Sequence, residues 1–152
     1  MSVLAAIRPD SVNFPLLVHV LGATVLVGGL ATALIAQALA WRREEPGAAA
    51  FTRLSFRALL LAALPGYIVM RIGAEWIYRE AGWDELDPAP SWIDLGYITA
   101  DLGAVVLLIA LILGGLAARR GSGTLARIAT VLTTILLVAY VIAVWAMTAK
   151  PT

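Results

Sequence analysis

Four long apolar runs constrain the fold of this chain more than any other feature; they cover residues 14–39, 58–70, 96–118 and 124–147. A helix needs roughly 20 apolar residues to cross the hydrocarbon core of a bilayer, which is about 30 Å thick. Three runs meet that length alone, and the second meets it if its helix continues to about residue 78. A β-barrel would need alternating apolar and polar residues, whereas these runs are continuously apolar. The sequence therefore predicts an all-α fold, a single transmembrane domain of four helices at about 14–40, 54–79, 93–118 and 124–148.

The composition agrees with lipid as the main solvent of the chain. Hydrophobic residues make up 61% and charged residues only 14%, whereas a soluble domain carries about a quarter charged residues. We therefore expect a multi-pass protein of the cytoplasmic membrane, with membrane lipids as its first partners. The net charge of +1 gives no field that would favour nucleic acid as a partner.

Several kinds of catalytic and metal site are missing from the sequence. The chain has no cysteine and one histidine, which excludes disulfides, thiolate metal sites and a multi-histidine metal site within one copy. It has no phosphate-binding glycine loop, no Gly-x-Ser-x-Gly elbow and no His-Glu-x-x-His pair. No catalytic residue is therefore predicted, and a non-enzymatic role is favoured over an enzymatic one.

The charges between the apolar runs predict an orientation. Arginine pairs at 42–43 and 119–120 mark the first and third loops, whereas the middle loop, 79–94, is acidic. Short arginine-rich loops stay in the cytoplasm, so both termini and the middle loop are expected outside. Aromatic residues that anchor helices at the membrane surface agree. Those expected at the outer surface are Trp76, Tyr78, Trp83, Trp92, Tyr97 and Trp145, with Trp41 at the inner surface.

Small residues inside the apolar runs predict where helices meet. Gly22 and Gly29 lie on the same face of the first helix as His19, and Gly66 and Gly73 lie in the second helix. Glycines of this kind let the backbones of membrane helices approach closely. Pro65 lacks a backbone N–H, so a kink in the second helix is expected near the middle of the membrane.

Polar side chains inside the apolar runs give the functional prediction. Counted from the outer surface, His19, Tyr67, Arg71 and Asp101 fall at similar depth on three helices, and Glu75 lies one turn beyond Arg71. A carboxylate in the middle of a membrane helix costs about 2.5–3.5 kcal/mol when it faces lipid. We therefore predict that these five residues converge on a ligand pocket in the outer half of the bundle, with Asp101 and Arg71 paired in its interior.

Structural roles for the same residues remain open. His19 could simply bond to a neighbouring backbone group, and Asp101 with Arg71 could be a structural ion pair. Arg71, Glu75 and Arg79 also form an i, i+4, i+8 ladder suited to ion pairing along one helix.

Three segments carry a resemblance to known membrane proteins. Residues 17–29 (LVHVLGATVLVGG), 64–66 (LPG) and 145–151 (WAMTAKP) resemble a bacterial integral membrane family called domain of unknown function 2269. The first segment is also similar, more remotely, to the opening helix of the CopD copper-resistance proteins and the HemJ membrane protoporphyrinogen oxidases. In those families a histidine of helix one handles metal or haem, which implies that His19 is a haem-iron ligand. HemJ-like proteins also use a lysine in a later membrane helix, and no lysine lies inside the apolar runs here.

Three functions follow as hypotheses. The first is a pocket around His19 that binds a cofactor or small ligand, with b-type haem as the first candidate. A six-coordinate haem would take its second ligand from His19 of a second copy in a homodimer. The second is a small transporter or channel with a polar path lined by His19, Asp101 and Arg71. The third is an accessory subunit of a larger membrane complex.

Overall fold

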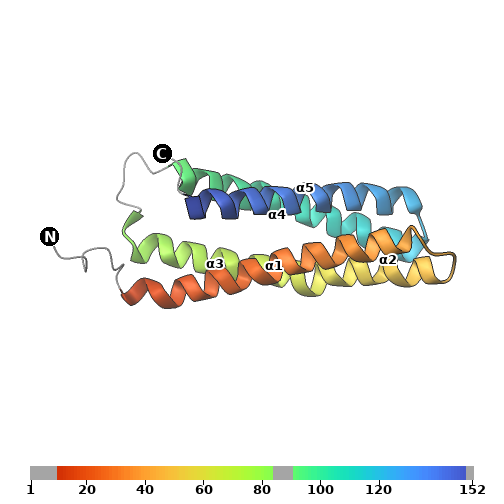
Figure 1. The fold of residues 1–152 in the computed structure, drawn as a ribbon, viewed down its shortest axis with the longest axis horizontal. Coiled ribbons are helices and arrows are strands. Elements are labelled where there is room, and N and C mark those ends of the chain that lie inside the picture. The colour runs from red at the N-terminus through yellow and green to blue at the C-terminus, as the bar shows by residue number, and fades with distance from the viewer. Residues whose placement is uncertain (1–9, 84–90, 150–152) are drawn as a thin grey trace.

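The computed structural model describes residues 10–83 and 91–149 and places them almost entirely in helices (Figure 1). A short 3-10 turn, Asp10–Val12, leads into α1 (Asn13–Ala40). Next come α2 (Gly47–Ala58), a π-helical segment (Leu59–Ala63) and α3 (Leu64–Glu80), which follow one another without a break. The chain then forms α4 (Ser91–Arg120) and α5 (Gly123–Ala149). No strand occurs in the described parts of the chain, so the all-α prediction is confirmed.

Four helical stretches are long and apolar enough to cross a membrane: Asp10–Ala40, Gly47–Glu80, Ser91–Arg120 and Gly123–Ala149. The second begins at Gly47, well before the predicted start near residue 54. Its first turns contain three consecutive alanines, at 48–50, and alanine is the best helix former. This extra length is only moderately apolar and carries Arg53, so it does not stand out as an apolar run in the sequence.

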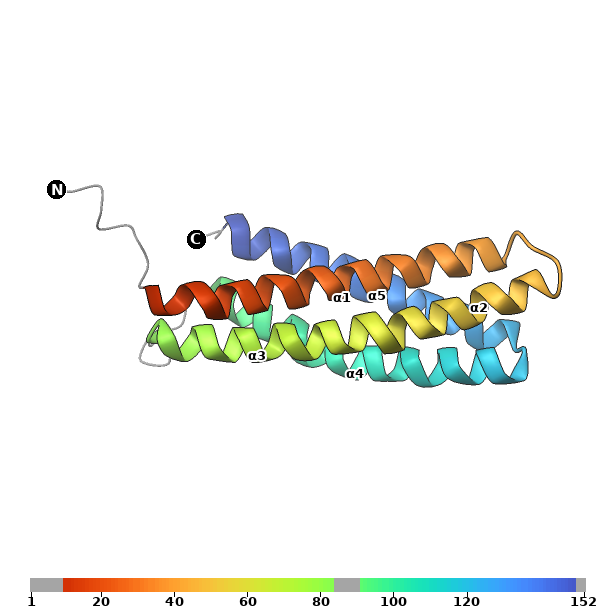
Figure 2. The ribbon, with the colours of Figure 1, turned by 90° about the horizontal axis from the view of Figure 1, so that it is seen from below.

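The helices form two antiparallel pairs, α1 with α3 and α4 with α5 (Figures 1 and 2). The two pairs lie closer together at one end than at the other (Figure 1). We call the end that holds the start of α1, the end of α3, the start of α4 and the end of α5 the terminal end. The opposite turn end holds the two double-arginine turns. Five of the six aromatic residues expected at the outer surface lie in the terminal-end parts of their helices, Trp83 follows the end of α3, and Trp41 lies at the turn end.

Glycines bring α1 into backbone contact with α3 and with the π segment that precedes it. A Cβ added at Gly29 would lie 2.5 Å from the backbone nitrogen of Ala63, and one at Gly73 would lie 2.5 Å from that of His19. Added Cβ atoms at Gly22 and Gly66 would likewise collide with backbone atoms of the facing helix. The predicted glycine contacts are therefore present, and they hold His19 directly against α3.

The helix continues through Pro65 because of the π segment before it. The N–H of Leu64 bonds to the carbonyl of Leu59, five residues back, instead of four. A proline in a regular helix removes one such bond and its ring collides with the carbonyl four residues earlier. The looser π turn absorbs this defect. The sequence predicted a kink at Pro65, and the structure has a π segment directly before Leu64.

Leucines from every helical stretch fill the middle of the bundle. Five of them are fully buried and belong to one apolar cluster: Leu26, Leu30, Leu59, Leu107 and Leu136. We call these five residues the leucine core.

Candidate functional site

A cavity of about 810 Å³ lies between the two helix pairs in the terminal-end half of the bundle. All four long helical stretches line it, and they contribute His19, Arg71, Tyr97 and Tyr140 as polar side chains. Most of the remaining lining is apolar, for example Leu16, Ala23, Ile77, Ile93, Ala100 and Ala143. Cavities of roughly 300–1,000 Å³ with apolar walls and a few polar groups are typical small-molecule sites.

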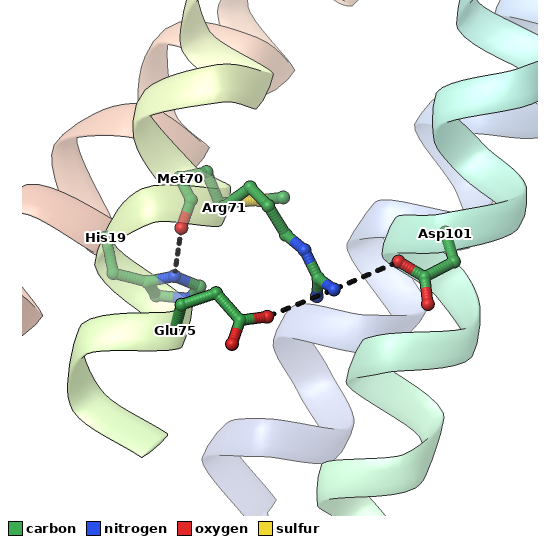
Figure 3. Close-up of polar contacts among 5 residues, drawn as sticks. All are labelled: His19, Met70, Arg71, Glu75 and Asp101. Atoms are coloured by element: carbon green, nitrogen blue, oxygen red, sulfur yellow. Dashed lines mark hydrogen bonds and ion pairs between the residues drawn. The ribbon is translucent and has the colours of Figure 1, made fainter. Parts of the chain in front are cut away.

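The imidazole of His19 is held by a hydrogen bond to α3 (Figure 3). Its Nδ1 lies 2.9 Å from the carbonyl oxygen of Met70, and a carbonyl can only accept. Nδ1 therefore carries the proton and donates it. In the neutral ring this leaves the lone pair on Nε2, for which no partner is found among the described residues. His19 thus makes the backbone bond that was its structural alternative, and it also lines a cavity.

Arg71 joins α3 to α4 (Figure 3). Its Nη2 lies 3.1 Å from Oε1 of Glu75 and 3.2 Å from Oδ1 of Asp101. Its Cζ lies 4.5 Å from the centre of the Tyr97 ring, which is cation–π geometry. We call Arg71, Glu75 and Asp101 the ion triad. The predicted Asp101–Arg71 ion pair is present. Of the predicted ladder, only the Arg71–Glu75 pair forms, and Arg79 is exposed with no ion pair to a described residue.

The interior position predicted for Asp101 is wrong. Its side chain is 62% exposed and does not line the cavity. Successive helix residues point about 100° apart, and α4 turns Ala100 and Gly103 into the bundle, so Asp101 lies on its flank. Arg71 reaches outward to meet it from a position only 26% exposed.

Two further predicted pocket residues also lie outside the cavity. The side chain of Glu75 is 42% exposed and sits beside Arg71 on the outer surface. Tyr67 is half-buried and packs against the leucine core. Of the five residues predicted to converge on a pocket, the structure therefore places only His19 and Arg71 in its lining.

Tyr140 is a cavity residue that the sequence analysis did not select. It is 4% exposed, and its hydroxyl has no hydrogen-bond partner in the described parts of the chain. A Cβ at Gly103 would lie 2.5 Å from that hydroxyl, so glycine is needed there for the tyrosine to reach α4. Buried hydroxyls are usually hydrogen-bonded, which makes this group available to a ligand. The sequence feature that could have identified Tyr140 is that it is the one tyrosine in the apolar run 124–147.

Aromatic side chains connect α3 and α4 at the terminal end of the cavity. The rings of Trp83 and Trp92 pack edge to face with centroids 5.2 Å apart, and those of Tyr78 and Tyr97 do so at 5.5 Å. All four residues line the cavity. A ligand that enters from this end would pass amphipathic aromatic groups first.

Comparisons of this chain with protein-family models, with curated proteins and with solved structures find no match. The resemblances of residues 17–29, 64–66 and 145–151 therefore stay predictions.

Proposed function

We propose that this membrane protein binds a small apolar or amphipathic ligand in the cavity, with Nε2 of His19 as its polar anchor. The observation that carries the proposal is the His19–Met70 hydrogen bond, which fixes the proton on Nδ1 and leaves the Nε2 lone pair on a residue that lines the cavity. The cavity supplies apolar walls and a hydroxyl from Tyr140 that has no partner among the described residues.

Haem b is the first candidate ligand because the donor group fits it. Neutral imidazole is a common axial ligand of haem iron, and histidines that bind metal usually donate their other N–H to a carbonyl or carboxylate. With one histidine per chain, the protein supplies one such ligand from each copy. Arg71 already contacts two carboxylates, so the part of the ligand beside it is expected to be uncharged.

The leucine core argues against the hypothesis of a transporter or channel. Leu26, Leu30, Leu107 and Leu136 are fully buried and fill the middle of the bundle, and Asp101 lies outside the cavity. A continuous polar path would have to cross this apolar layer. The geometry therefore supports a binding site that ends at this apolar layer better than a channel.

A haem titration of the purified protein tests the proposal. The native chain in detergent is expected to take up one haem with a saturable Soret band. His19→Ala should weaken binding by more than the roughly 10–100-fold typical of losing an outer-shell partner, with helix content unchanged. Ala100→Trp, which fills the cavity, should also block uptake. Thr32→Ala, on the same helix outside this cavity, is the matched control.

Binding that is equal in the native chain, His19→Ala and Ala100→Trp would mean that haem only partitions into the detergent, and the haem proposal would fail. If Ala100→Trp blocks uptake and His19→Ala does not, the cavity binds the ligand without His19 as its anchor.

We also propose that both termini face the outside of the cytoplasmic membrane, because the double-arginine turns share the turn end. The chain lacks cysteine, so single cysteines can be labelled uniquely. In intact cells an impermeant thiol reagent is expected to label a cysteine at position 87, outside the described residues, but not one at Ser122. Both should react once the membrane is permeabilised. Labelling at Ser122 alone would reverse the orientation.

A further inference from the structure

The ion triad lies on the outer surface of the bundle, at a depth where lipid would surround it. The thirty residues of α4 span about 45 Å, and Asp101 lies about 15 Å from the start at Ser91. A hydrocarbon layer about 30 Å thick, centred on α4, would place Asp101 about 7 Å inside its edge. Its side chain is nevertheless 62% exposed.

The triad has a surplus of negative charge. One guanidinium faces two carboxylates, and both contact the same nitrogen, Nη2. The formal charge of the group is therefore −1. The face of the guanidinium is covered by the Tyr97 ring, and no other cation contacts Asp101 or Glu75 within the described residues.

The surface around the triad is apolar. Ile98, Leu102 and Val105 of α4 are exposed on one side, and Ile68 and Ile72 of α3 are exposed on the other. Lipid tails match these side chains but offer no positive group. A membrane helix can supply both an apolar surface and a cation.

We propose that this α3–α4 face docks a membrane helix of another protein that carries one lysine or arginine at the depth of Asp101. The added cation would bring the formal charge of the group to zero, and the flanking isoleucines and leucine would pack against the helix. A second copy of this chain does not suit the face, because two triads would place like charges opposite one another. The proposal is independent of the cavity ligand.

Fluorescence energy transfer in vesicles tests the proposal. The chain carries a donor at a cysteine introduced at Ser122, far from the triad. The acceptor is attached to a model leucine–alanine membrane helix with one lysine about five residues inside its apolar segment. The lysine helix is expected to associate about ten-fold more tightly than the same helix with leucine there. A helix with aspartate at that position should bind no better than the leucine helix.

Variants of this chain locate the effect. Asp101→Asn and Glu75→Gln each remove one negative charge from the triad, and either should abolish the preference for lysine. Asp94→Asn makes the same change in the same helix near its start, and the preference should persist. Retained helix content identifies folded variants, and two triad variants keep the test valid if one does not fold.

Equal association of the lysine and leucine helices with the native chain would overturn the proposal. So would a lysine preference that survives both triad variants. Transfer between donor- and acceptor-labelled copies of the native chain alone, lost in Asp101→Asn, would show that a second copy occupies this face instead.

Discussion

Gly22→Ala is expected to force α1 away from α3 and to destabilise the protein by about 3 kcal/mol or more. The new Cβ would collide with the backbone of Met70, which cannot rotate away as a side chain can. Met70 also supplies the carbonyl that holds His19, so ligand binding should fall with stability. Thermal unfolding in detergent, followed by helix content, measures the first effect.

Gly28→Ala is the matched control because it makes the same change six residues further along α1. A Cβ at Gly28 would meet no atom within 4 Å. Alanine is the better helix former by about 1 kcal/mol, so this variant is expected to be as stable as the native chain or more so. Similar melting temperatures for the two variants would contradict the close approach of α1 and α3.

Arg71→Leu is expected to have the second large effect, a loss of about 2–3 kcal/mol. It would leave Glu75 and Asp101 in an apolar surface without their shared cation. Asp101→Asn should cost less, because Arg71 keeps Glu75. Asp94→Asn, near the start of α4, should cost little.

The triple replacement of Arg71, Glu75 and Asp101 by leucine separates charge pairing from packing. It removes every charge of the ion triad, so stability should return toward the native value in spite of three changes. The same unfolding assay compares all the variants. A triple variant less stable than Arg71→Leu would show that the side chains matter by their shape and not by their charge.

The helices could be predicted because a continuous apolar run that is long enough to cross the hydrocarbon core is expected to form a membrane-spanning helix. The glycine faces of α1 and α3 were also visible, since Gly22, Gly29, Gly66 and Gly73 keep helical spacing. The start of the second helix at Gly47 was missed because the added turns depend on alanine helix propensity and not on apolarity. The length of an apolar run identifies the part of a helix that crosses the hydrocarbon layer. It is less sensitive to helical turns near the edge of that layer.

The site could be predicted only in part. The sequence gives the depth of a residue along its helix more reliably than the direction in which its side chain points. His19, Arg71 and Asp101 do fall at related depths, and the Arg71–Asp101 pair forms. The assumption that a carboxylate must point inward was wrong, because a long arginine can reach outward to meet it. Tyr140 was missed because a single tyrosine in an apolar run looks the same in the sequence as an ordinary aromatic residue of a membrane helix. Its contact with Gly103 depends on packing between α4 and α5.

The π segment sets the angular phase of everything that follows it on α3. A π turn contains one residue more than the α-helical turn it replaces, and one helical residue corresponds to a rotation of about 100°. Without that residue Gly66, Met70 and Gly73 would turn away from α1, and Arg71 would no longer point toward α4. Both the acceptor for His19 and the bridge to Asp101 therefore depend on a single extra residue placed before Pro65. In this chain the length of one five-residue segment, more than its composition, determines which side of α3 faces α1 and which faces α4 in the terminal-end half of the bundle.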